Sequence, residues 1–262
     1  MVDLALAKRR SAAAQLRAAG CIAAAKEAAM LVAAAASPAE LERMLVRRES
    51  GEPLAWIMGR TRFAGVDLHV RSGVYVPRPH TEPLAREAAA RLPAGGLAVD
   101  LCTGCGAIAA VLLAAVPSAR VLATDIDPAA VSCARRNGVD ALRGDLAQTL
   151  PPGLEGTVDV VTACPPYVPD ADLHLLARDV RAHEPLLALA GGADGLDVAR
   201  RCVEAAARLL RPGGWLLIEI GGRQAGTIAA HMERHGLAAV HTGRDSDGYD
   251  RRVRARCVNT GV

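Results

Sequence analysis

The chain of 262 residues has few aromatic side chains and no large excess of either charge. Aromatic residues make up 2% of the sequence, and the formal net charge is +3. This charge is too small to attract nucleic acid over a long range, and few rings are available for stacking on bases. We therefore expect no stable nucleic-acid binding, although a local basic patch remains compatible with the composition.

Long apolar runs and regularly spaced cysteines are also missing. The longest apolar stretch near the start, residues 28–36, is far too short to span a bilayer, so we expect no membrane association. Seven irregularly spaced cysteines are typical of reduced thiols, which predicts a cytoplasmic protein. Cys102 and Cys105 have the C-x-x-C spacing, but no second pair completes a zinc site, so we expect no metal.

Residues 3–50 show a helical pattern without strand-like alternation. They are rich in Ala, Leu, Arg and Glu, with apolar residues at every third or fourth position. The run Ser37-Pro38-Ala39-Glu40 is a capping box with proline at the first helical position, which predicts a helix from 38 to about 51. We expect a small helical N-terminal domain over residues 1–60.

The pattern changes at about residue 63. The stretch "FAGVDLHV" alternates like a hairpin strand, and the three prolines of "VYVPRPHTEPL" (74–84) exclude a regular helix or central strand until after Pro83. We assign residues 61–85 to a hairpin and linker, and residues 86–262 to a larger second domain.

The second domain alternates strands with helices. The predicted order is a strand and glycine turn (96–106), a helix (107–116), a strand (119–127), a helix (128–137), a strand from 158, a helix (195–210) and a strand (214–222). Such alternation implies an α/β fold with a mostly parallel sheet and helices on both faces.

The glycine turn predicts a nucleotide-like ligand. At Gly104-x-Gly106 the backbone bends tightly and approaches a ligand without an intervening side chain. Asp125 ends the next strand, where a ribose diol would find a carboxylate. Both features fit NAD as well as S-adenosylmethionine. Asp100, ahead of the loop, favours the cationic ligand, because a carboxylate repels a pyrophosphate but suits an ammonium and a sulfonium.

Two of the acidic residues also have plain structural interpretations. Asp100 could cap the turn after its strand. Asp145, in "RGDL" (143–146), could hold an adenine amino group or be a solvated turn residue.

A set of short motifs stands in a distinctive order along the chain. They are "VPRPHTE", "DLCTGCGAIA", "TDID", "CPPYV", "VRAHEPLLAL", "GGADGLD" and "LLRPGGWLLIEIG". This order resembles the release-factor-specific protein-(glutamine-N5) methyltransferases, the HemK/PrmC family, from about Gly51 to Arg251, and the helical N-terminus looks like that family's substrate-recognition domain. The resemblance implies a Rossmann-like class I S-adenosylmethionine-dependent methyltransferase fold with a seven-stranded sheet. It also implies S-adenosylmethionine as methyl donor and, as acceptor, the glutamine of the Gly-Gly-Gln motif in peptide-chain release factors.

The resemblance further implies a set of site residues. Those for the cofactor are Asp100, Cys102, Thr103, Gly104, Gly106, Asp125, Ile126, Asp145, Leu146 and Cys164. Those of the catalytic turn are Cys164, Pro165, Pro166 and Tyr167, and the substrate-binding residues are Arg78, Glu82, Tyr167, Glu184 and Pro185. We expect Glu82 to order its loop, with a plain surface role as the alternative.

The family's Asn-Pro-Pro-Tyr turn is altered at its first residue. An amide nitrogen is a poor nucleophile, so an enzyme must hold the NH2 group with acceptors that favour a pyramidal nitrogen. In the family the Asn side-chain oxygen is one acceptor, and the carbonyl of the next residue, which the prolines hold rigid, is the other. Here Cys164 replaces the Asn, and a thiol is only a weak acceptor.

Three interpretations of Cys164 stay open. It is a tolerated replacement in a slower glutamine methyltransferase, or it marks a divergent enzyme that acts on another protein side chain, a nucleic-acid amine or a small molecule. A nucleophilic cysteine is the least favoured, because no histidine lies near it in sequence. His80 stands where the family usually has Asp, and Cys102 and Cys105 stand where it has Gly and a small residue.

Other functions use parts of the same pattern. A methyltransferase of adenine or guanine amines would share the Pro-Pro-Tyr turn, whereas an NAD-dependent oxidoreductase would explain only the glycine loop. A non-catalytic S-adenosylmethionine-binding protein, with its acceptor site decayed at Cys164, is the alternative to an enzyme. The combined motifs favour methylation of protein glutamine. The oligomeric state and the role of His80 are not determined by the sequence.

Overall fold

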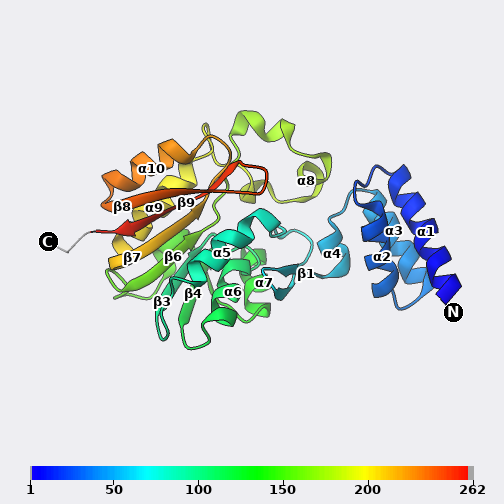
Figure 1. Cartoon of the computed structure of the whole chain (residues 1–262), viewed down its shortest axis with the longest axis horizontal. Helices are drawn as coiled ribbons and strands as arrows, with labels where there is room; N and C mark the ends of the chain where they lie inside the picture. Colours follow the sequence, from blue (N-terminus) through cyan, green and yellow to red (C-terminus); the bar gives the residue numbers. More distant parts are fainter. Residues whose placement is uncertain (1, 259–262) are drawn as a thin grey trace.

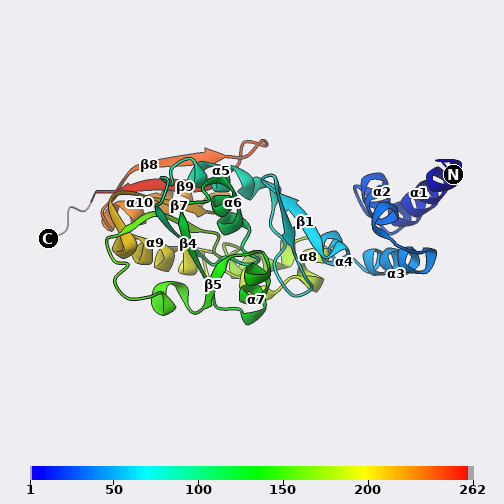
Figure 2. The same ribbon diagram turned by 90° about the horizontal axis from the view of Figure 1, so that it is seen from below.

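The computed structural model describes residues 2–258 of the chain and opens with four helices. They are α1 (Val2–Ala18), α2 (Ala24–Ala34), α3 (Pro38–Glu49) and α4 (Leu54–Met58). Helix α3 begins at Pro38 as predicted, and the Ser37 hydroxyl caps it by accepting the Glu40 N–H at 3.2 Å. The helices pack around an apolar core of their own and lie at one end of the elongated molecule, joined to the rest through α4 (Figures 1 and 2).

The hairpin and the proline-rich segment follow. Strands β1 (Arg60–Phe63) and β2 (Val66–His69) pair antiparallel, as the alternating pattern predicted. A 3-10 turn (Pro79–Thr81) then leads into α5 (Glu82–Ala89). The helix thus begins before Pro83, and the prediction of no helix until after Pro83 is wrong. Proline is tolerated in the first turn because the N–H groups there have no partner within the helix.

A seven-stranded sheet forms the larger part of the molecule. Its strands are β3 (Leu97–Leu101), β4 (Arg120–Asp125), β5 (Asp140–Arg143), β6 (Val158–Ala163), β7 (Leu210–Glu219), β8 (Leu237–Arg244) and β9 (Asp250–Cys257). The spatial order is β5-β4-β3-β6-β7-β9-β8, with β9 antiparallel to both of its neighbours and all other pairs parallel. The predicted α/β fold with a mostly parallel sheet is confirmed.

Helices cover both faces of this sheet. One apolar cluster joins one face to α5, α6 (Ala107–Ala115) and α7 (Pro128–Arg136). The other joins the opposite face to α9 (Asp197–Leu209) and α10 (Ala225–Arg234). Successive residues of β3 serve the two clusters, since Ala98 belongs to the first and Val99 to the second. The short helix α8 (Arg178–His183) lies toward the N-terminal helices (Figure 1).

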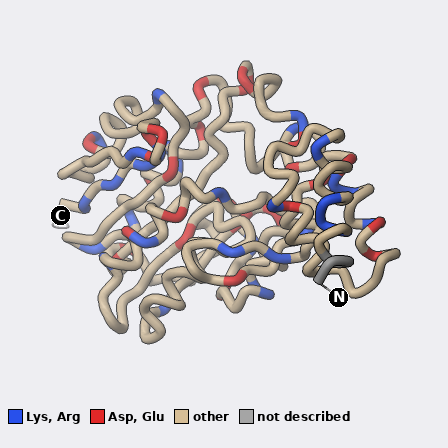
Figure 3. Tube along the Cα trace, turned by 45° about the vertical axis from the view of Figure 1, so that its right-hand side comes forward, with Lys and Arg blue, Asp and Glu red and all other residues tan. Residues whose placement is uncertain are grey.

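The surface carries both charges in mixture. Figure 3 shows Lys and Arg interspersed with Asp and Glu over the whole trace. Within residues 2–258, no helix combines the length and the apolar character that crossing a membrane requires.

Trp56 connects the N-terminal helices to the larger domain. Its indole N–H donates to the Val74 carbonyl at 2.9 Å, and its ring meets the His183 ring edge-on, with 6.4 Å between centroids. His183 in turn contacts the Ser50 carbonyl through Nε2 at 3.2 Å. These contacts give His183 a structural role between the two parts of the molecule.

We predict that Trp56→Phe lowers the free energy of unfolding by about 1–3 kcal/mol, because it leaves the Val74 carbonyl without its partner in a buried place. Denaturant unfolding followed by circular dichroism measures this loss. Trp215→Phe is the control, because it mainly weakens the stacking of Arg91 and Arg256 on the aromatic ring and should cost less. Equal losses in the two variants would contradict the role of the indole N–H bond.

Candidate active site

A cavity of about 520 Å³ opens at the carboxyl ends of β3, β4 and β6. Strand order reverses here, since β4 lies on one side of β3 and β6 on the other. This is where open α/β sheets bind ligands, and the volume suits a small molecule. The walls are the glycine loop after β3, the end of β4, the Pro-Pro-Tyr turn after β6 and parts of segment 176–189.

Asp100 holds the glycine loop from behind. The residue is 1% exposed, and the hydroxyls of Thr103 and Thr162 each donate to its carboxyl group at 2.6 Å. Burial raises the pKa of Asp100 to about 6, against the opposing effect of these two hydrogen bonds. Asp100 does not line the cavity, so the contact shown is with the loop. Direct contact with the ammonium group of a ligand stays a prediction.

Asp125 faces the cavity from the end of β4. Its carboxyl group accepts the backbone N–H of Gly104 at 2.8 Å and that of Asp127 at 2.9 Å. Burial raises the pKa of Asp125, and the two backbone hydrogen bonds oppose this effect. The remaining lone pairs can accept hydrogen bonds from a ribose diol. Ile126 follows with its side chain half exposed, and offers an apolar surface to a base.

The two glycines of the loop serve different purposes. Gly104 lines the cavity with a φ of +57°, whereas Gly106 does not line it. A Cβ on Gly106 would lie 3.0 Å from the side chains of Ala134 and Val139, so this glycine permits close packing of α6 on α7. Cys102 also has a left-handed φ, +55°, a conformation that costs a non-glycine residue about 1–2 kcal/mol.

The far end of the cavity holds Asp145 and Leu146. Arg201 of α9 donates to the Asp145 carboxylate at 2.6 Å, and Leu146 is buried next to it. The predicted cofactor set therefore includes a carboxylate for the ribose, apolar side chains for the adenine and free backbone at the loop. Nothing in this donor set conflicts with S-adenosylmethionine.

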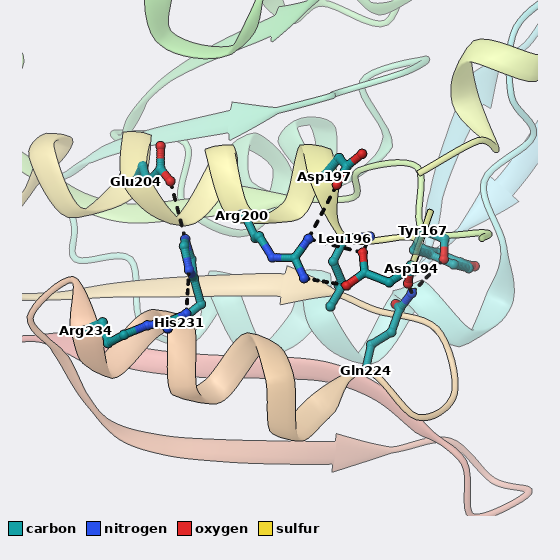
Figure 4. A network of polar contacts seen from close by, with 9 residues as sticks. All are labelled: Tyr167, Asp194, Leu196, Asp197, Arg200, Glu204, Gln224, His231 and Arg234. Atoms are coloured by element: carbon teal, nitrogen blue, oxygen red, sulfur yellow. Dashed lines mark hydrogen bonds and ion pairs between the residues drawn. The ribbon is translucent and has the colours of Figure 1, made fainter. Parts of the chain in front are cut away.

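The Pro-Pro-Tyr turn forms the wall beside the glycine loop, because the two follow the neighbouring strands β6 and β3. Pro165, Pro166 and Tyr167 line the cavity together with Cys164. Gln224 fastens the turn from outside, because its Nε2 donates to the Tyr167 carbonyl at 2.8 Å (Figure 4). The sequence analysis missed Gln224, whose only signal is its place just after "IEIGG".

Three glycines lie so close to this turn that no side chain fits on them. A Cβ on Gly195 would lie 2.3 Å from the Tyr167 carbonyl oxygen, and one on Gly191 would lie 2.7 Å from that of Pro166. A Cβ on Gly221 would lie 2.9 Å from the Tyr167 ring. The turn therefore packs against bare backbone on two sides, which restricts its movement.

Cys164 and His80 belong to the same cavity, although they lie far apart in sequence. Both line the cavity, and His80 Nε2 lies 3.5 Å from the Tyr167 hydroxyl. Burial, followed by the nearby Glu219 carboxyl group, raises the pKa of the Cys164 thiol well above its usual range. A neutral thiol is a poor nucleophile, which weighs against the interpretation of Cys164 as a catalytic nucleophile.

The predicted substrate-binding residues divide into two groups. Arg78 and Pro185 line the cavity, and Arg78 pairs with Glu184, which is buried behind it. Glu82 does not line the cavity, and its carboxylate pairs with Arg86 of the same helix at 2.6 Å. This ion pair lies within α5. The Glu82 backbone N–H donates to the Pro79 carbonyl of the preceding turn, but no hydrogen bond or ion pair among residues 2–258 joins the Glu82 side chain to that loop.

One group outside the cavity has the composition of a metal site. Ligand atoms of Glu204, His231 and His235 lie within 4.8 Å of one another. Arg234 contacts His231 Nδ1 at 3.2 Å and can only donate, so the imidazole proton belongs on Nε2, which lies 3.5 Å from the Glu204 carboxylate (Figure 4). A protonated Nε2 cannot bind a metal, so this arrangement suits a His–Glu pair.

We predict that Gly195→Ala lowers the free energy of unfolding by about 1–3 kcal/mol and lowers the rate of methyl transfer. The new methyl group would clash with the Tyr167 carbonyl, and a φ of +76° is unfavourable for alanine. Chemical denaturation and single-turnover kinetics measure the two effects. Gly226→Ala in α10 is the control, since a Cβ there meets no atom within 4 Å. A Gly195→Ala variant as stable and active as wild type would contradict the packing argument.

The raised pKa of Asp100 predicts a pH dependence of stability. In the folded protein the Asp100 carboxyl group keeps its proton up to about pH 6, whereas its ordinary pKa is 3.8. The protein therefore loses stability as the pH rises from about 4 to 6. The free energy of unfolding of wild type, relative to that of Asp100→Asn, should fall by roughly 3 kcal/mol over this window and then stay level. Denaturant titrations at several pH values measure it. A difference that does not change with pH would refute this prediction.

Comparisons with known proteins agree with this geometry. A family model described as a methyltransferase domain matches residues 98–184. Among solved structures, a methyltransferase from Pyrococcus furiosus shares the fold, with a TM-score of 0.53 and 20% identity over 74% of this chain and 90% of that one.

Two curated relatives are more similar in sequence. A 4-amino-L-phenylalanine/4-methylamino-L-phenylalanine methyltransferase from Streptomyces pristinaespiralis is 42% identical and covers 70% of this chain and 66% of its own length. A release factor glutamine methyltransferase from Geobacter sulfurreducens is 38% identical over 219 residues, which cover 81% of this chain and 76% of that protein. With this similarity, and with a class I methyltransferase sheet around a fitting cavity, the chain belongs to the release factor glutamine methyltransferase family.

Proposed function

We propose that this protein transfers a methyl group from S-adenosylmethionine to the side-chain amide nitrogen of the glutamine in the Gly-Gly-Gln motif of peptide-chain release factors. The observation that carries the proposal is the rigid Pro-Pro-Tyr turn beside the glycine loop, with glycine backbone and Gln224 packed behind it. Amide nitrogen needs fixed acceptors to react, and a turn restricted in this way limits the movement of its Pro165 carbonyl, the acceptor proposed here.

One set of cavity residues would bind the cofactor, and another would bind the methyl acceptor. S-adenosylmethionine supplies an electrophilic methyl group, and Gly104, Asp125, Ile126, Asp145 and Leu146 are the residues that would hold it. The Pro165 carbonyl and Cys164 would hold the NH2 group of the acceptor, and the Tyr167 ring would pack against its side chain. No general base is required, because the nitrogen loses its proton readily after methylation.

The surface around the cavity suits a protein substrate. Leu175, Leu186 and Leu187 are more than half exposed; Leu186 and Leu187 belong to segment 176–189, which forms one wall of the cavity, and Leu175 directly precedes it. Exposed large apolar side chains in a group are typical of an interaction surface. We propose that this segment, together with the N-terminal helices, contacts the release factor.

We also propose that the protein works in the cytoplasm. All seven cysteines lie within residues 21–257 and are free thiols, and several are buried in the domain core. Free thiols are typical of a reducing compartment such as the cytoplasm, where the protein would encounter release factors.

Mass spectrometry of unmethylated release factors, after incubation with this protein and S-adenosylmethionine, tests the proposal. One added methyl group on the Gly-Gly-Gln glutamine is the expected result. A parallel reaction offers 4-amino-L-phenylalanine, because one relative is named for that acceptor. If only the amino acid is methylated, and S-adenosylhomocysteine binding is confirmed, the assignment as a methyltransferase holds but the proposed protein substrate is wrong.

We predict that Cys164→Asn raises the rate of glutamine methylation by about 10-fold or more, because an amide oxygen is a stronger acceptor than a thiol. Single-turnover kinetics with a release factor measures the change, and S-adenosylhomocysteine affinity serves as the control for folding. A rate that does not rise would show that the thiol does not limit the reaction.

A further inference from the structure

Glu219 is a buried carboxyl group beside the catalytic turn. The register pairs Ala163 of β6 with Ile218 of β7, so Cys164 and Glu219 are neighbours where these parallel strands end. Glu219 is 1% exposed, and neither of its carboxyl oxygens has a hydrogen-bond partner among residues 2–258. Burying such a group without partners is costly, so its presence next to the active site calls for a functional explanation.

Three cavity-lining side chains surround this carboxyl group. His80 Nε2 lies 3.4 Å from Glu219 Oε1 and 3.5 Å from the Tyr167 hydroxyl. The third, Cys164, has its thiol pKa raised first by burial and then by the charge of the Glu219 carboxyl group. The titratable groups that face Glu219 are Tyr75, His80, Cys164, Tyr167 and Arg251.

Glu219 can act on a substrate only through these neighbours. It does not line the cavity, whereas Cys164, His80 and Tyr167 all do. The strand register places Cys164 beside Glu219, but no hydrogen bond joins the thiol to the carboxyl group, since both carboxyl oxygens lack a partner among residues 2–258. A small rotation of the thiol hydrogen and the carboxyl group would complete this bond when an acceptor fills the cavity.

We infer that Glu219 is a positioning residue that enables the Cys164 sulfur to accept a hydrogen bond from the methyl acceptor; this inference rests on the proposed function. When the S–H donates to Glu219, its hydrogen points away from the cavity and the sulfur lone pairs face the substrate. A donor bonded to an anion is itself a better acceptor, because successive hydrogen bonds polarise one another. The Cys164–Glu219 pair thereby takes over part of the work of the Asn that this chain lacks.

The first test examines the thiol and needs no methyl acceptor. Glu219→Gln replaces the carboxylate by a neutral group of the same shape, so the Cys164 thiolate should form at lower pH. We expect iodoacetamide to label Cys164 about tenfold faster in this variant at about pH 8, as measured by peptide mass spectrometry. Cys21, between the first two helices, is the internal reference, and its labelling rate should not change.

The second test is a double-mutant cycle on methylation of the release factor. Glu219→Gln should lower kcat by about tenfold in the wild-type chain, with KM for S-adenosylmethionine unchanged. The same change made on top of Cys164→Asn should alter kcat by less than about twofold, because the Asn oxygen needs no carboxyl group behind it. Glu87→Gln is the matched control, since this carboxyl group pairs with Arg252 and Arg254 away from the cavity.

Two results would overturn the inference. One is an equal loss of kcat in both backgrounds, which would mean that Glu219 acts through His80 or through folding. The other is unchanged labelling of Cys164 in Glu219→Gln. If the wild-type protein methylates no release factor, the proposed function fails, but the labelling rates still decide whether Glu219 controls the thiol.

Discussion

The close approach of bare backbone to the Pro-Pro-Tyr turn is the constraint on which the site depends. Gly191 and Gly195 leave room for the carbonyls of Pro166 and Tyr167, and Gln224 completes the enclosure by donating to the Tyr167 carbonyl. Proline restricts the turn from within, and the glycines restrict it from outside. The Pro165 carbonyl belongs to the same restricted turn and therefore needs little reorganisation when a substrate arrives, which is how an enzyme favours reaction at a weak nucleophile.

Carboxyl groups at the ends of strands organise the parts that face this turn. Asp100 ties the glycine loop to β6 through two threonine hydroxyls, and Asp125 fixes the same loop through the Gly104 N–H. Glu219 lies behind the turn itself. Asp100 and Glu219 are costly to bury, so tight packing in the domain core has to hold them in place. The sheet does this, because all three lie at the carboxyl ends of strands that are packed on both faces.

Much of the fold could be predicted from periodicity and capping. The helices from Pro38, Ala107 and Pro128 begin where they were expected, because proline and glycine mark those boundaries. Strands β8 and β9 were not assigned from their residues, because both carry many charged and polar side chains in place of a clear apolar alternation. Helix α10 was missed as well, since it has no side-chain cap at its start.

The sequence by itself determined the family, the alternation of strands and helices, and the residue types of the catalytic turn, because these depend on local order along the chain. Tertiary structure alone decided which of them meet. Only the pairing of β6 with β7 brings Glu219 to Cys164, and only the packing of the proline-rich linker brings His80 to Glu219 and Tyr167. The physical reason is that contacts between distant segments follow from strand register and packing, which a one-residue shift would change throughout.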